Sequence, residues 1–259
     1  IEAHGSFENY KKYKLKFFEY VKNNHILNKD DRYFQEFFDI PAKNKIVYSA
    51  GDYKNIKLKL WGDFNTANAV ATIKTAEIYG IKPDLAIKIL EKIEFLPGRM
   101  EQINEGQKFK VIVDYAHTPD SMEAVYKSLK LKLVIGAKLI CVFGATGGGR
   151  DKWKRLEYGK ISERYCDEII LTNEDQYDEN PEEILKQIEK GVLQTQGKGS
   201  KVKKIIDRKE AIQRGVGLAK EGDIVIITGK GSESTMMIAG GKKIHFDDRE
   251  VAREILKSL

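Results

Sequence analysis

Apolar residues change their spacing along the chain, and two parts can be told apart. In the first part, helical spacing is found at residues 7–23, 65–79 and 84–93, and short strand-like runs at 26–27, 46–48 and 58–61. Gly80 ends the second helix and Pro83 opens the third. The Pro-Gly turn in Leu96-Pro97-Gly98 follows, and we expect a domain boundary there.

Beyond this turn the two patterns alternate strictly. Strand-like apolar runs occupy residues 110–115, 139–143, 168–172, 201–206 and 223–228, and helical stretches follow them at 119–131, 151–165, 181–190, 208–219 and 248–257. Such alternation predicts an α/β fold, a doubly wound and mostly parallel sheet. Ligands bind these sheets beyond the carboxyl ends of the strands, so a site is expected in the loops at those ends.

Polar segments follow four of the five predicted strands, at residues 114–117, 144–150, 173–177 and 229–233. In the second segment, glycines at 144 and 147–149 would let the backbone turn sharply and approach a ligand closely. Arg150 and Lys152 would place cations there, beside the free N–H groups of the next helix. The loop matches neither GxGxxG nor GxxxxGK[ST], so a plain tight turn is an equally good interpretation.

The composition argues against membrane, secreted and nucleic-acid-binding proteins. With 32% charged and 41% hydrophobic residues the 259-residue chain is ordinary for a globular protein, and it has no apolar run long enough for a membrane span or a signal core. Its net charge of +6 is spread over interleaved acids and bases, so we expect no nucleic-acid or membrane partner. Cys141 and Cys166 form no CxxC pair, so neither a disulfide nor a zinc site is expected, and a cytoplasmic location fits.

Several separated motifs resemble those of the Mur ligases, in particular those of the MurE type. They read LPGRME at 96–101, DYAHTPD at 114–120, FGATGGGRDKWKR at 143–155, GKGSE at 229–233 and DDR at 247–249, preceded by GDFNTAN at 62–68 and by His4-Gly5, Tyr10 and Lys14. They occur in the family's order over essentially the whole chain, which is more specific than the glycine loop alone. The resemblance implies a partial central ATPase domain at 1–97 and a C-terminal ligase domain at 98–259.

The resemblance also implies a reaction, the ATP-dependent formation of an amide bond. ATP would phosphorylate the terminal carboxylate of UDP-MurNAc-L-Ala-D-Glu, and the amine of a free amino acid would attack the acyl phosphate, which adds the third residue of the peptidoglycan precursor. ATP and Mg²⁺ are the implied cofactors. The UDP-MurNAc-dipeptide and the amino acid are the implied partners of a monomeric enzyme.

Four residues are expected to bind the nucleotide by analogy with the family. Asn65 and Arg99 would contact it, Arg99 from the interdomain hinge. Asp114 would accept a hydrogen bond from a ribose hydroxyl, although it could instead cap the turn after its strand. His117 could orient a phosphate or only satisfy its own loop, and the sequence favours neither.

Lys14 aligns with the lysine that is carbamylated in the family and helps to bind magnesium. Only a neutral amine reacts with carbon dioxide, and the nearby Lys11, Lys12 and Lys16 would favour the neutral form of Lys14. The alternative is that Lys14 is one lysine of a solvated basic face.

The incoming amino acid is expected to meet Arg150, Glu174, Asp175, Tyr177, Gly229 and Glu233. Arg150 would hold a carboxylate and Glu233 an ammonium. Residues 174–177 read EDQY where the family reads DNPR in diaminopimelate ligases or DNPA in lysine ligases, and Ser232 stands where the family has histidine. Without the arginine, we expect a side-chain ammonium to be preferred to a second carboxylate. The alternative is a solvent-facing loop in which Tyr177 only packs on Pro181.

The chain departs from the family in lacking the phosphate-binding GxxGK[ST] loop and the UDP-binding domain. We therefore expect the second half of a ligase, inactive by itself. The alternatives are another Mur-type ligase, similar to cyanophycin or folylpolyglutamate synthetase, or a non-catalytic protein that retains a nucleotide or amino-acid pocket.

Overall fold

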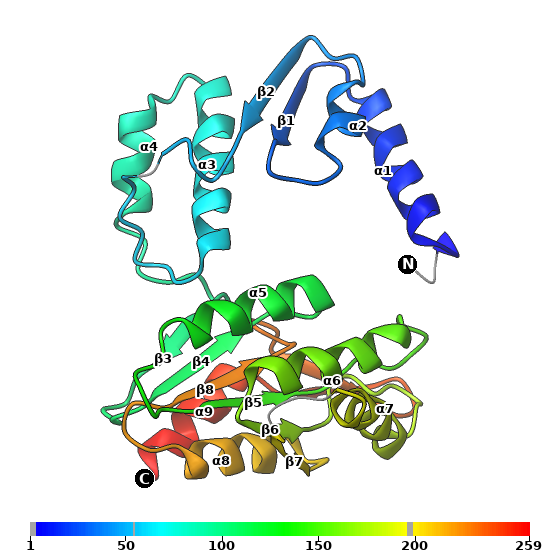
Figure 1. Ribbon diagram of the computed structural model, residues 1–259, viewed down its shortest axis with the longest axis vertical. Helices are drawn as coiled ribbons and strands as arrows, with labels where there is room; N and C mark the ends of the chain where they lie inside the picture. The colour runs from blue at the N-terminus through cyan, green and yellow to red at the C-terminus, as the bar shows by residue number, and fades with distance from the viewer. Residues whose placement is uncertain (1–3, 54, 196–198) are drawn as a thin grey trace. The chain divides into compact units, whose positions relative to one another are not determined.

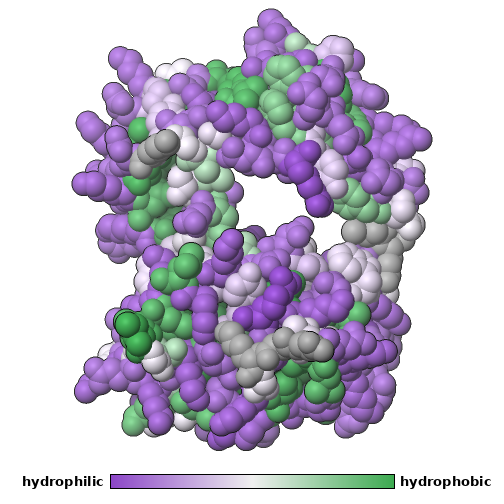
Figure 2. All heavy atoms as spheres, in the orientation of Figure 1, coloured by the Kyte–Doolittle hydropathy of each residue, from purple (hydrophilic) through white to green (hydrophobic). Residues whose placement is uncertain are grey.

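The chain forms two compact units, Ile1–Glu94 and Phe95–Leu259. The computed structural model describes residues 4–53, 55–195 and 199–259 (Figure 1). The Pro-Gly turn expected to separate two domains lies just inside the second unit. On the face drawn in Figure 2, hydrophilic side chains predominate on each unit, and apolar side chains are interspersed among the hydrophilic ones.

The first unit combines four helices and two strands within its described residues. They are α1 (Phe7–Tyr20), β1 (Asn24–Asn28), α2 (Phe34–Phe38), β2 (Asn44–Tyr48), α3 (Asp63–Ile78) and α4 (Pro83–Leu90). Ser6 caps α1, because its side chain accepts a hydrogen bond from the N–H of Asn9 at 3.1 Å. The strands β1 and β2 pair in parallel as a two-stranded sheet.

The prediction of a strand at residues 58–61 is wrong. These residues form bends and irregular backbone that lead into Gly62, whose φ of +100° starts α3. Alternating leucine and lysine suggested a strand, but no partner strand pairs with the segment in the described part of the unit. The short helix α2 was not expected, since its five residues are too few to show a period.

The second unit holds a six-stranded sheet with helices on both faces. Its elements are β3 (Glu101–Ile103), β4 (Lys110–Asp114), α5 (Pro119–Lys130), β5 (Leu139–Phe143), α6 (Trp153–Tyr165), β6 (Glu168–Leu171), α7 (Pro181–Leu193), β7 (Lys201–Lys204), α8 (Arg208–Leu218), β8 (Ile224–Thr228), β9 (Thr235–Ile238), β10 (Lys242–His245) and α9 (Asp248–Lys257). The strand order is β3-β4-β8-β5-β6-β7, and all neighbours are parallel except β3 and β4. The doubly wound, mostly parallel sheet is confirmed. The strand β3 and the hairpin β9–β10 were not expected.

The position of β8 creates a topological switch point, which is where ligands bind in doubly wound sheets. The last parallel strand in the chain inserts between β4 and β5, so the connections leave in opposite directions from this place. One face of the sheet packs against apolar residues of α8 and α9, namely Ala211, Ile212, Val216, Ala252, Ile255 and Leu256. Figure 1 shows α5 and α6 on the other side of the sheet. Because both faces are covered, every residue of β5 and β8 is buried.

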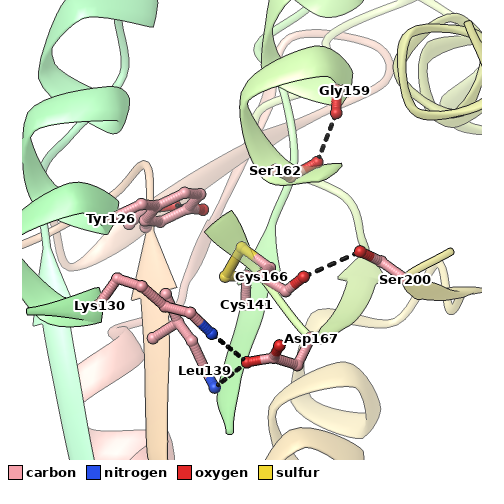
Figure 3. Close-up of a disulfide and its surroundings, with 10 residues drawn as sticks. Tyr126, Lys130, Leu139, Cys141, Gly159, Ser162, Cys166, Asp167 and Ser200 are labelled. Carbon is pink, nitrogen blue, oxygen red and sulfur yellow. Dashed lines mark hydrogen bonds and ion pairs between the residues drawn. A yellow bond between two sulfur atoms is a disulfide. The ribbon is translucent and has the colours of Figure 1, made fainter. Parts of the chain in front are cut away.

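The two cysteines form a disulfide, so the expectation that they would not is wrong. Cys141 lies in β5 and Cys166 follows α6, and their sulfur atoms are 1.97 Å apart although the residues are separated by 25 positions (Figure 3). The missing CxxC pair was a poor guide, because the helical crossover from β5 to β6 brings Cys166 back beside β5. The neighbouring Asp167 accepts hydrogen bonds from Leu139 N and Lys130 Nζ at 2.9 and 2.7 Å.

No helix among the described residues is long and apolar enough to cross a bilayer.

Reduction of the disulfide is expected to destabilise the second unit by about 3 kcal/mol, because the cross-link restricts the unfolded chain over 25 positions. Urea unfolding with and without dithiothreitol measures this difference. The double variant Cys141→Ala/Cys166→Ala is the control, and its midpoint should not respond to the reductant. An equal midpoint for the wild type in both conditions, with free thiols verified after reduction, would contradict the expectation.

Limited proteolysis is expected to cut the first unit before the second. The first unit has a two-stranded sheet with open edges, and it exposes Tyr13, Phe17 and Tyr20 of α1 by 58, 62 and 84%. In the six-stranded sheet of the second unit, the central strands β5 and β8 are buried along their whole length. Mass spectrometry of the fragments should show early cleavage before Leu96 and a persistent C-terminal piece; equal resistance of both units would refute this.

Candidate functional site

The loops at the carboxyl ends of β4, β5, β6 and β8 surround a cavity of about 270 Å³ in the second unit. Its lining residues are Tyr115, His117, Ala145, Thr146, Arg150, Asp151, Lys154, Tyr158, Glu174, Asp175, Tyr177, Gly229 and Glu233. All six residues expected to meet an amino acid are among them, together with His117. The lining also includes side chains that the sequence reasoning missed, above all Thr146, Lys154 and Tyr158.

The buried guanidinium of Arg208 holds two of these loops in place. Its Nε and Nη2 donate to the carboxylate of Asp248 at 2.7 and 2.8 Å, and neither side chain is exposed. Nη1 donates to the carbonyl of Asn173 at 3.1 Å, and Nη2 also donates to that of Thr228 at 3.0 Å. These carbonyls come directly before Glu174 and Gly229, so Arg208 sets where both enter the cavity wall.

The glycines after β5 allow the loop after β5 to pack closely against the loop after β6. A Cβ at Gly144 would lie 2.3 Å from the carbonyl oxygen of Thr172, and one at Gly147 would lie 2.2 Å from that of Gln176. The N–H of Gly147 also donates to the carbonyl of Asp175 at 2.9 Å. Close approach was expected towards a ligand, and the structure shows it towards the loop after β6.

Glu174 lies at the wall between the loops after β6 and β8. It is only 5% exposed, and its Oε1 accepts a hydrogen bond from Thr146 Oγ1 at 3.0 Å. Burial raises the pKa of Glu174. The other oxygen lies against Gly229, where a Cβ would be 2.0 Å from Oε2, and the φ of +115° at this residue further favours glycine.

Behind the cavity lies a cation that the sequence reasoning missed. Lys230 is fully buried, and its Nζ is 3.0 Å from Asp175 Oδ2 and 2.9 Å from Glu233 Oε2. Burial disfavours its charge, but the hydrogen bonds to Glu233 and Asp175 outweigh this and raise the pKa of Lys230. The signal was available in the Gly-Lys-Gly segment, where a lysine between two glycines follows a buried strand.

The acids of the cavity therefore already have partners. Asp175 Oδ1 accepts from Met237 N at 2.7 Å in addition to the bond between Oδ2 and Lys230, and Glu233 Oε1 accepts from Tyr115 Oη at 3.2 Å. The expectation that Asp175 awaits an incoming ammonium disagrees with this arrangement, because both of its oxygens are engaged. Arg150 differs, since its side chain has no partner among the described residues.

Tyr177 lies against the glycine loop. A Cβ at Gly148 would be 2.6 Å from the ring of Tyr177, and Tyr177 itself has a φ of +52°. Residues 174, 175 and 177 all line the cavity.

The second unit holds three of the residues expected to bind a nucleotide, and they lie around the segment that follows β4. They are Arg99, Asp114 and His117. Asp114 is buried, and its oxygens accept from the N–H groups of Met100 and Ala116, both at 2.8 Å, so it caps the turn as the alternative held. Burial raises the pKa of Asp114. His117 Nδ1 lies 2.9 Å from the carbonyl oxygen of Tyr115, and the Arg99 guanidinium lies 4.5 Å from the centre of the Tyr115 ring.

Two expected site residues belong to the first unit. Lys14 is exposed on α1, with its Nζ 5.5 Å from the centre of the Tyr10 ring. Lys11 was expected to repel its charge, but Lys11 is itself paired with Glu36 at 3.0 Å. Asn65 is buried at the start of α3, and its Nδ2 donates to the carbonyl of Trp61 at 2.6 Å.

No group of three or more His, Cys, Asp or Glu side chains in the described ranges is placed to hold a metal ion.

Gly229→Ala is expected to destabilise the second unit by about 2 to 4 kcal/mol, because the new Cβ would overlap the Glu174 carboxylate in a left-handed backbone conformation. Gly217→Ala is the matched control, since nothing lies within 4 Å of its Cβ position. As Gly217 is within α8, alanine there should be neutral or stabilise by up to about 1 kcal/mol. Thermal unfolding of both variants checks this, and similar melting temperatures would contradict the proposed fit.

Comparison with known proteins identifies the kind of domain that carries this cavity. Residues 98–231 match the family described as "Mur ligase, glutamate ligase domain". The chain is 37% identical to UDP-N-acetylmuramoyl-L-alanyl-D-glutamate--2,6-diaminopimelate ligase of Syntrophomonas wolfei and 39% identical to the protein of that name from Aquifex aeolicus. Both alignments cover 99% of this chain but only 57% and 56% of the relatives. The chain thus spans just over half the length of these relatives.

Solved structures agree with this likeness. A structure of UDP-N-acetylmuramoyl-L-alanyl-D-glutamate--2,6-diaminopimelate ligase superposes with a TM-score of 0.59 at 29% identity, over 98% of this chain and 57% of that one. A pseudomurein peptide ligase type C from Methanothermus fervidus reaches 0.65 at 18% identity, over 98% and 60% of the two chains. The second likeness is one of fold.

Proposed function

This chain belongs to the Mur ligase family, and on that premise we propose that it is the C-terminal part of an ATP-dependent ligase that joins an amino acid to UDP-N-acetylmuramoyl-L-alanyl-D-glutamate. The observation that carries the proposal is the cavity at the strand ends, where Arg150, Glu174 and Glu233 come together. The names of relatives that align with nearly the whole chain support the reaction. In this proposal, residues 1–97 are part of the central ATPase domain and 98–259 are the ligase domain.

The proposed reaction proceeds through two displacements. The γ-phosphoryl group of ATP passes to the terminal carboxylate of the substrate, and ADP leaves. The amine then attacks the acyl carbon, phosphate leaves, and the nitrogen loses a proton. The cavity contributes orientation: Arg150 binds a carboxylate of the amino acid, and Glu233 lies beside its ammonium, so that the amine is held for attack.

We propose 2,6-diaminopimelate as the amino acid. The relatives bear its name. Sequence reasoning favoured lysine because Glu174 and Asp175 were expected to face a free ammonium, yet Thr146 and Lys230 already donate to them. An amino acid with a second carboxylate suits such a cavity better than one with an added cation alone.

The nucleotide contacts remain predictions from the family resemblance. They involve Asn65, Arg99, Asp114 and His117, and the carbamate of Lys14 would add one oxygen ligand to a magnesium site completed by other residues. When bound, magnesium would neutralise charge on the transferring phosphoryl group. We further propose that the protein acts as a monomer in the cytoplasm, where ATP is available, and that it engages neither membrane nor nucleic acid.

The proposal is tested by isothermal titration of the 259-residue chain with 2,6-diaminopimelate. Arg150→Ala should weaken binding by about tenfold or more, because a charge-assisted hydrogen bond to a carboxylate is lost. Arg164→Ala is the control: this arginine pairs with Glu123 at the far end of α6 and should leave the affinity unchanged. If the wild-type chain binds neither 2,6-diaminopimelate nor lysine, the proposed pocket is wrong.

A further inference from the structure

The charge of the cavity depends on a residue that does not line it. Four carboxylates face the cavity, those of Asp151, Glu174, Asp175 and Glu233, against the cations of Arg150 and Lys154. Lys230 adds a third cation from behind the wall. With Lys230, the four acids exceed the cations by one, and without it they would exceed them by two.

Lys230 acts through two acids that a ligand can reach. Asp175 and Glu233 both line the cavity, and the Lys230 ammonium lies at hydrogen-bond distance from each. Asp175 is also held from the other side by the N–H of Met237, so both of its carboxylate oxygens are already engaged. The protein thus supplies internally part of the positive charge that these acids would otherwise draw from a ligand. The Glu233 side chain is still 42% exposed, so it can also meet the ammonium of the amino acid.

The two candidate amino acids differ in the group that would sense this charge. Lysine ends in an ammonium and carries a net positive charge, whereas 2,6-diaminopimelate ends in an ammonium and a carboxylate and is neutral overall. A buried ammonium that is already paired with Asp175 and Glu233 lowers the attraction for another unbalanced cation and does not penalise a second carboxylate.

We propose, on the basis of the function proposed above, that Lys230 is a positioning residue that sets the amino-acid preference: by neutralising Asp175 and Glu233 it selects 2,6-diaminopimelate over lysine. The arginine expected at position 177 from the family pattern is then not required. The preference arises from a lysine that never touches the ligand.

The test measures dissociation constants of the 259-residue chain for lysine and for 2,6-diaminopimelate by isothermal titration. Lys230→Met leaves Asp175 and Glu233 without their cation, so the ratio of the lysine constant to the diaminopimelate constant should fall by about tenfold or more. Asp175→Asn removes one acid and keeps Lys230 paired with Glu233, so the ratio should rise a fewfold. The double variant Asp175→Asn/Lys230→Met should return towards the wild-type ratio.

The outcomes separate this inference from the proposed function. A wild type that binds neither amino acid overturns both. A wild type that binds 2,6-diaminopimelate, with an unchanged ratio in folded Lys230→Met, overturns the inference alone. Should circular dichroism show that Lys230→Met is unfolded, Asp175→Asn decides, because a fall or no change in its ratio also contradicts the proposed role. A merely structural role of Lys230 would weaken both ligands together and leave the ratio constant.

Discussion

The arrangement of the site depends on one buried ion pair, that of Arg208 with Asp248. Both side chains are fully buried, so removing either one would leave an unpaired buried charge at a cost of several kcal/mol. Each charge is tolerated in the interior only because the other is present. The remaining donors of Arg208 are used by the carbonyls of Asn173 and Thr228. Two helix starts and two strand ends therefore meet at one guanidinium, and the walls of the cavity inherit their positions from it.

The cavity itself follows from strand order. Because β8 lies between β4 and β5, the loops after three adjacent strands open at the same edge and are joined by the loop after β6. The loops pack so closely that residues 144, 147 and 229 have no room for a side chain. This packing explains the glycines better than ligand binding does. The ligand space is what remains after the loops have packed on one another.

The alternation of strands and helices after residue 98 was predictable, because the central strands β5, β6 and β8 are buried along their whole length and read as apolar runs. The loops that form the cavity were also predictable, because ligands bind parallel sheets beyond the carboxyl ends of the strands. The strand at 58–61 failed, since alternation without a partner is not a strand, and the three residues of β3 carry too little pattern. The disulfide and the contact of Lys230 with Asp175 were missed because both join positions that only the tertiary fold brings together.

The contact between the glycine loop and the loop after β6 has a consequence for protein engineering. Backbone carbonyls of Thr172 and Gln176 lie where any side chain at 144 or 147 would be. A segment transplanted into 172–177 to change the substrate would therefore meet the wrong surface unless residues 144–150 came from the same donor. The two segments form one exchangeable module, and over evolutionary time substitutions in them should appear as correlated pairs.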